Sequence, residues 1–107
     1  MTNFISTGST YWISDEEIQI LEKNATNGDK NSAFKLYQYH MFVSLDQDLE
    51  FKWLEIAAKN GHPIAQSNLA DLFFTQSNKE KAIFWAKKAY RNGAKLPDEL
   101  KILININ

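Results

Sequence analysis

One sequence frame occurs twice in this chain. The stretch WLEIAAKNG occupies residues 53–61 and WAKKAYRNG occupies residues 85–93, so the two frames are offset by 32 residues. With the same offset and no gap, Ala33 aligns with Ala65. A fixed period in the thirties is typical of helical-repeat proteins, in which each unit is a helix pair that buries its apolar face only against its neighbours. The offset therefore predicts two full repeats that stack side by side.

Start and stop signals around the apolar segments predict six helices. Ser14, Ser44 and Ser77 each precede a Glu or Gln by three positions, which is the capping-box spacing at a helix start. Asn-Gly pairs follow three of the segments, and Gly readily takes the left-handed conformation that ends a helix. Within the segments, apolar residues recur with helical spacing. The expected helices cover residues 14–26, 30–43, 46–60, 63–75, 78–92 and 97–104.

Short linkers between these helices favour antiparallel neighbours. We therefore expect an all-α fold: a right-handed α-solenoid of antiparallel helical hairpins, with two full repeats of 32 residues and a capping half-repeat at each end. A single domain is expected over residues 1–107, with an N-terminal arm at 1–13, repeats at 14–96 and a C-terminal capping helix at 97–107. Tyr11, Trp12 and Ile13 are expected to cover the apolar face of the first helix.

The second repeat resembles the Sel-like repeat family, a relative of the tetratricopeptide repeats. The residues that carry this resemblance are Ala65, Leu69, Ala70 and Phe73, followed by Ala82, Trp85, Ala89 and Gly93. The first repeat matches in part, through Ala33, Tyr37 and Met41, then Trp53, Ala57, Ala58 and Gly61. Two features depart from the family pattern. The Gly-rich connector is missing, and Gln38 and Glu50 replace small residues, which predicts a wider separation of the two helices in the first repeat.

Charge is unevenly distributed along the chain. The net charge is −1, but residues 1–60 hold nine acids and five bases, whereas residues 61–107 hold four acids and seven bases. Such a dipolar chain can steer a charged partner. The absence of cysteine excludes disulfides, thiolate nucleophiles and Cys-based metal sites. The chain contains no stretch with the pattern of a signal peptide or a membrane span, so the expected location is cytoplasmic and no membrane partner is expected.

No constellation of catalytic residues is apparent. His40 and His62 lack the HExxH spacing of a zinc site. We expect His62 to be a surface or capping residue, and His40 to pack or face water. There is also no Gly-rich phosphate loop and no nucleophile elbow. The sequence thus favours a non-enzymatic protein with no cofactor and no metal.

The resemblance implies a set of partner-binding residues on the first helix of each hairpin, which lines the inner side of such solenoids. Carried over, these positions are Lys35, Tyr39 and Phe42 in the first repeat and Ser67, Asp71 and Phe74 in the second. Exposed aromatic rings in a groove are typical anchors for a partner. For Phe42 and Phe74, a place in the core between hairpins is an equally open reading.

The resemblance further implies a protein–protein interaction module. The most concrete expectation is a small bacterial immunity protein that binds and blocks a cognate toxin, because small proteins that resemble this family often have that role. The alternative is a homo-oligomeric or regulatory adaptor that dimerises through the apolar tail, which contains Leu100, Ile102, Leu103, Ile104 and Ile106. Nucleic-acid binding through the basic fifth helix is less favoured, since cations near a helix C-terminus are stabilised by the helix dipole.

Overall fold

The computed structural model of the chain describes residues 10–105, and every regular element within them is helical. The elements are α2 (Asp15–Thr26), α3 (Lys30–Tyr39), the π-helix η1 (His40–Ser44), α4 (Gln47–Lys59), α5 (Pro63–Thr75), α6 (Lys79–Arg91) and α7 (Asp98–Leu103). The expected all-α fold class is confirmed, with the predicted helices found within a few residues of their expected bounds.

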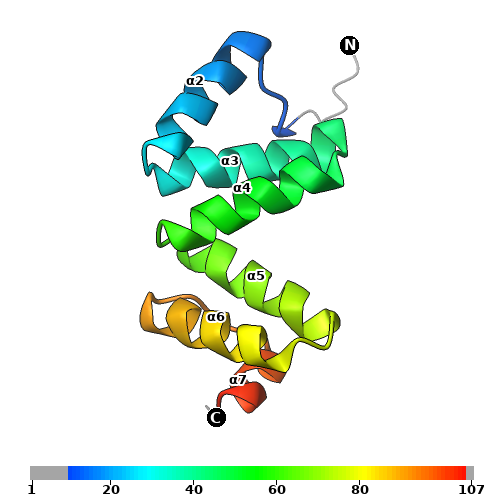
Figure 1. The fold of residues 1–107 in the computed structure, drawn as a ribbon, viewed down its shortest axis with the longest axis vertical. Coiled ribbons are helices and arrows are strands. Elements are labelled where there is room, and N and C mark those ends of the chain that lie inside the picture. The colour runs from blue at the N-terminus through cyan, green and yellow to red at the C-terminus, as the bar shows by residue number, and fades with distance from the viewer. Residues whose placement is uncertain (1–9, 106–107) are drawn as a thin grey trace, which may run out of the picture.

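The helices stack in a zigzag along the long axis of a molecule that measures 49 × 35 × 23 Å (Figure 1). Each helix packs chiefly against the helices that precede and follow it in the chain. Helices α3 and α4 form one hairpin, and α5 and α6 form the next. Helices α2 and α7 flank these hairpins at the two ends of the stack. This is the arrangement of antiparallel hairpins between two half-repeats that the 32-residue offset predicts.

The core consists of buried alanines on facing helices, with larger side chains filling the space around them. Eight alanines have no exposed surface: Ala33, Ala57, Ala58, Ala65, Ala70, Ala82, Ala86 and Ala89. Small side chains allow helix backbones to approach closely. Trp53 and Trp85, the first residues of the two repeated frames, are both buried in the same core. The first residue of each repeated frame therefore occupies an equivalent, buried position in its hairpin.

The Asn-Gly pairs end the helices as predicted. Asn60 is the C-cap residue of α4, and Gly61 follows it with a φ of 97°. The amide of Gly61 donates to the carbonyl of Ala58 at 3.1 Å, and the amide of His62 donates to that of Ala57 at 3.0 Å. These bonds satisfy carbonyls that the helix end would otherwise leave free, as in a Schellman motif. Only a residue without a β-carbon takes such a φ at no steric cost.

Two of the three predicted N-caps are wrong. Ser14 caps α2, but Asp46 caps α4 and Asn78 caps α6, where Ser44 and Ser77 were expected. Asp and Asn accept hydrogen bonds from free helix amides as well as Ser does, and both lie closer to the helices that they cap. Ser77 has a φ of 61°, which is a left-handed conformation rather than the extended one of an N-cap.

The helix expected over residues 30–43 is not regular throughout. Its α-helical part ends at Tyr39, and residues 40–44 form the wider turn of η1. The buried His40 places its Nδ1 2.7 Å from the Oγ of Ser44, which is within hydrogen-bonding distance across this turn. Leu45 then reverses the direction of the chain with a φ of 58°. This left-handed conformation is uncommon for a leucine, so the sequence did not predict it.

A buried glutamine ties the two repeats together. Gln66 in α5 is only 2% exposed. Its Nε2 donates to the carbonyl of Ala58 at 3.0 Å, and its Oε1 accepts from the Nδ2 of Asn92 at 2.9 Å. Nearby, Asn68 donates to the hydroxyl of Tyr37 at 3.3 Å. Gln66 thereby joins the last turn of α4 to the C-cap of α6, so the ends of both hairpins are held by one side chain.

Replacement of Gln66 should destabilise the fold strongly. The Gln66→Ala variant loses one buried and one partly buried hydrogen bond and leaves the amide of Asn92 without its acceptor, so we expect the free energy of unfolding to fall by about 2–4 kcal/mol. Urea denaturation followed by circular dichroism measures this change. Gln19→Ala is the matched control, because Gln19 is exposed on α2, and it should change stability by less than about 0.5 kcal/mol. Equal effects of the two substitutions would contradict this role of Gln66.

Candidate binding site

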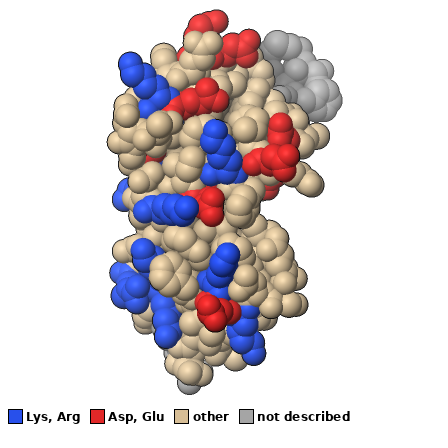
Figure 2. All heavy atoms as spheres, in the orientation of Figure 1, with Lys and Arg blue, Asp and Glu red and all other residues tan. Residues whose placement is uncertain are grey.

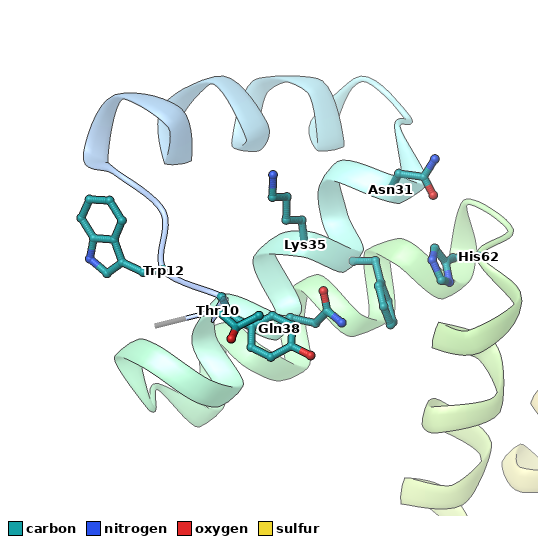
Figure 3. Close-up of a pocket in the computed structure, with 8 residues that line it drawn as sticks. Thr10, Trp12, Asn31, Lys35, Gln38 and His62 are labelled. Carbon is teal, nitrogen blue, oxygen red and sulfur yellow. The ribbon is translucent and has the colours of Figure 1, made fainter. Parts of the chain in front are cut away.

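A hollow of about 380 Å³ lies along one side of α3 (Figure 3). Its walls come from three parts of the chain: the segment before α2, one face of α3 and the start of α5. We call it the α3 hollow, and its lining residues are Thr10, Tyr11, Trp12, Asn31, Phe34, Lys35, Gln38 and His62.

The floor of the hollow is a single face of α3. Asn31, Phe34, Lys35 and Gln38 recur at i, i+3, i+4 and i+7, so they lie side by side on the helix surface. The opposite side of the helix is buried in the core through Ala33, Leu36 and Tyr37. Because the buried side fixes the rotation of α3, it also fixes which side chains are presented to the hollow.

One wall is a stacked pair of rings. The rings of Phe34 and His62 are nearly parallel, with centroids 4.0 Å apart. His62 is also the N-cap of α5, and its Nδ1 accepts a hydrogen bond from the amide of Ala65 at 3.2 Å. Burial, with Lys30 nearby, lowers the pKa of His62 below its usual value. The imidazole is therefore held in a fixed orientation, in its neutral form, with Nε2 left to carry the proton. The expectation that His62 is a capping residue is confirmed.

The other wall is the segment before α2. Trp12 is 64% exposed, and its indole stands at the edge of the hollow (Figure 3). Tyr11 stacks on Phe42, with ring centroids 4.7 Å apart. Ile13 alone of these three residues is buried in the core. Of the three residues expected to cover the first helix, Ile13 is therefore the one that is buried, whereas Tyr11 lies against Phe42 of η1 and the indole of Trp12 is largely in solvent.

Lys35 lies in the hollow and forms an ion pair with Glu17. Its Nζ is 3.2 Å from the Oε2 of Glu17, and both side chains are about half exposed. An exposed ion pair contributes little to stability. It does, however, connect α3 to α2, so the cation is oriented at the edge of the hollow while it remains accessible.

None of the other five residues predicted to bind a partner lines the α3 hollow. Tyr39 and Phe42 are half-buried, and Ser67 is buried, with 8% of its surface exposed. Asp71 and Phe74 are exposed on α5, but neither lines the α3 hollow. Neither ring belongs to the core between hairpins, because Phe42 is half-buried in a stack on Tyr11 and Phe74 is 36% exposed.

The cause of this difference is the rotation of the helices. The face of α3 that lines the hollow contains positions 31, 34, 35 and 38, whereas the first-repeat positions carried over by the resemblance are 35, 39 and 42. The two sets are shifted by about one residue and share only Lys35. The helical spacing of Asn31, Phe34 and Gln38 is visible in the sequence and was the signal that could have identified them.

A second hollow of about 380 Å³ lies between α4 and α5. It is lined by Gln47, Glu50, Phe51, Leu54, Leu72 and Gln76. Glu50, one of the two residues that replace a small residue of the family pattern, is in this lining. The larger side chain thus lies at the junction of the two repeats, beside an open space rather than within a tight contact.

The side chains of the α3 hollow offer several kinds of contact to a ligand. They offer aromatic rings, the amide groups of Asn31 and Gln38, and the cation of Lys35. His40, the other histidine, is buried, and its Nε2 has no hydrogen-bond partner among residues 10–105. In the same part of the chain, no group of three or more His, Cys, Asp or Glu side chains is placed to hold a metal ion.

Comparison with known proteins finds a relative whose own role is not established. No family model matches the sequence, and no solved structure matches it. The uncharacterized protein YibG of Escherichia coli K12 is 35% identical over 95 residues, an alignment that covers 82% of this chain and 62% of YibG. The chain therefore spans about three fifths of the length of that relative. None of the helices within residues 10–105 has the length and apolar character needed to cross a bilayer.

Both histidines should make the fold sensitive to mild acid. Burial is the main cause that lowers the pKa of His40 and of His62 below 6.5, although Asp46 and Glu22 oppose it at His40. The unfolded chain therefore takes up protons first as the pH falls. Stability is complete above the unfolded pKa and decreases as the pH falls through it. We expect a lower free energy of unfolding near pH 5 than near pH 7.5.

Urea denaturation at the two pH values tests this expectation. The control is the double variant His40→Asn/His62→Asn, in which the new amide side chain at the start of α5 still offers an N-cap acceptor. Its stability should change less between the two pH values than that of the original chain. An identical pH dependence in both proteins would show that other groups are responsible.

Proposed function

We propose that this chain is a non-catalytic, protein-binding module of the Sel-like repeat type, and that it receives a segment of its partner in the α3 hollow. The observation that supports the proposal best is a hollow with the exposed Trp12 at one end and the stacked pair of Phe34 and His62 at the other (Figure 3). Aromatic side chains at the edge of a pocket are the residues most often found as energetic anchors of protein interfaces.

The chemistry of the hollow favours a polypeptide as ligand. Asn31 and Gln38 each offer an amide donor and an amide acceptor, which match the hydrogen-bonding groups of an extended backbone. The apolar rings offer contact area for one partner side chain, and Lys35 favours a carboxylate close to it. Most of these residues stand on α3 or at the N-cap of α5, so they are held in place before binding, which reduces the entropic cost of association.

The most specific form of this proposal is an immunity protein in the cytoplasm that binds and blocks a toxin domain. The resemblance to Sel-like repeats supports it, together with a hollow that offers aromatic, amide and cationic groups to a partner. Such a protein acts by occupying a surface that the toxin needs, and high affinity for one partner is the property on which this function depends.

The alternative of an adaptor that dimerises through its C-terminal tail receives less support. Leu100 is fully buried, and Leu103 and Ile104 pack against the core of the same chain. Ile102 is 71% exposed, and Ile106 lies outside the described residues. Most of the apolar side chains that this alternative requires for a dimer contact therefore have contacts within the monomer.

Substitution of Trp12 should weaken partner capture. With the chain as bait in cells that express it naturally, we expect the recovery of one protein at a near-equimolar ratio. We expect the Trp12→Ala variant to bind that protein at least about tenfold more weakly, as for other interface anchors. Ile20→Ala is the matched control, because Ile20 is also largely exposed but lies on α2 outside the hollow. Equal recovery with both variants would exclude the hollow as the binding site.

The identity of the captured protein tests the immunity role. We expect its expression alone to stop growth, and co-expression with this chain, but not with the Trp12→Ala variant, to restore growth. If the captured protein has no toxicity, the chain is an adaptor. If the chain recovers only further copies of itself, the homo-oligomeric alternative replaces the proposal.

A further inference from the structure

Helix α6 presents an exposed phenylalanine in the middle of a basic face. Phe84 is 53% exposed, and Lys87, Lys88 and Arg91 follow it at i+3, i+4 and i+7, so the four side chains share one side of the helix. We call these four residues the α6 basic face. Figure 2 shows Lys and Arg side chains gathered over the half of the molecule that holds α5 to α7, and most Asp and Glu over the other half.

The cations of this face have no carboxylate partner within residues 10–105. The ion pairs of that part of the chain join Lys35 to Glu17, Lys59 to Glu55 and Lys101 to Asp98. Instead, the Nζ of Lys88 lies 5.3 Å from the ring centroid of Phe84 and 5.6 Å from that of Trp85. Glu80, one turn before Phe84, is the only acid on this helix. The basic side chains are therefore available to an external anion.

The helix dipole accounts for part of this pattern only. Lys88 and Arg91 lie in the last turn of α6, where cations are favoured. The dipole does not account for a phenylalanine left half in water among them, because burial of such a ring is favourable by about 2 kcal/mol. An aromatic ring with mostly positive charges around it is the arrangement of an interface anchor with an electrostatic rim.

We propose that the α6 basic face docks an acidic segment of a protein, whose carboxylates pair with Lys87, Lys88 and Arg91 and whose apolar side chain covers Phe84. This face shares no residue with the α3 hollow, so the inference goes beyond the proposed function and does not depend on it. We infer an acidic ligand from charge complementarity. The face is positive although the whole chain has a net charge of −1, so it attracts anionic groups to this part of the surface.

The charge distribution favours an acidic protein segment over a nucleic acid. The half of the chain at residues 1–60 carries nine acids and five bases, and the whole molecule is only 49 Å long. A nucleic-acid strand longer than the face would therefore meet repulsion from the acidic half, whereas a short acidic segment would not. Proteins that bind single strands also present several aromatic rings in succession along a basic groove, and the α6 basic face contains a single ring.

Selection from a random peptide library tests the proposal without knowledge of the partner. Phage-displayed peptides of about twelve residues are selected on the full chain and depleted on the Lys87→Glu/Arg91→Glu variant, which removes peptides that bind elsewhere. We expect the retained peptides to combine several Asp or Glu residues with an apolar or aromatic one, and to bind weakly, with a Kd of about 1–100 μM. Retained peptides without acids, or no peptide that distinguishes the two proteins, would overturn the proposal.

Fluorescence anisotropy with the best selected peptide then separates the contribution of the Phe84 ring to binding from that of the basic side chains. We expect Phe84→Ala to weaken binding about fivefold or more, and Lys87→Glu/Arg91→Glu to weaken it by at least tenfold, with a loss of affinity as salt is raised. Lys23→Glu, a charge reversal at an exposed lysine of α2, should leave the affinity unchanged, as should Trp12→Ala in the α3 hollow. Unchanged affinity in Phe84→Ala would overturn the role of the ring. Equal or tighter binding of an oligothymidine of similar length would assign the face to nucleic acid instead.

Discussion

The burial of small alanine side chains between packed helices is the constraint on which the rest of this structure depends. Ala33, Ala57, Ala65 and Ala89 are fully buried, and small side chains at such positions allow packed helices to approach closely. The tryptophans, the buried leucines and Gln66 then fill the remaining space around these contacts. Packing of the core fixes the rotation of each helix. It therefore also determines which side chains lie on the outer side of that helix and are available for binding.

His62 shows how the fold and the candidate site share the same atoms. Its imidazole begins α5 by accepting the amide of Ala65, and the same ring forms a wall of the α3 hollow through its stack on Phe34. A residue with two such tasks restricts both: the ring cannot turn toward a ligand without release of the helix start. One wall of the hollow therefore forms as a result of the His62 cap at the junction between the two hairpins.

The sequence was sufficient for the helices and the repeat but not for the site. Asn-Gly ends and helical periodicity depend on local chemistry, so α2 to α7 were predictable. Ser44 and Asp46 are both able to cap α4, and Ser77 and Asn78 are both able to cap α6. The tertiary structure decides which of the two side chains caps each helix. Of the predicted binding residues, Lys35 alone lines the hollow, because a shift of about one residue in the rotation of α3 changes its outer face. Trp12 and His62 join that face from distant parts of the chain, which only tertiary structure can show.

The position of Gln66 has a consequence for how the molecule comes apart. In a stack in which each helix contacts chiefly its neighbours, hairpins are able to open one at a time from either end. Gln66 opposes this stepwise opening, because its side chain is hydrogen-bonded to the end of α4 and to the end of α6 at the same time. Neither hairpin separates without the exposure of a buried amide that also serves the other. We therefore expect the two repeats to unfold as one cooperative unit, with the slowest amide exchange in α5 and the earliest fraying in α2 and α7.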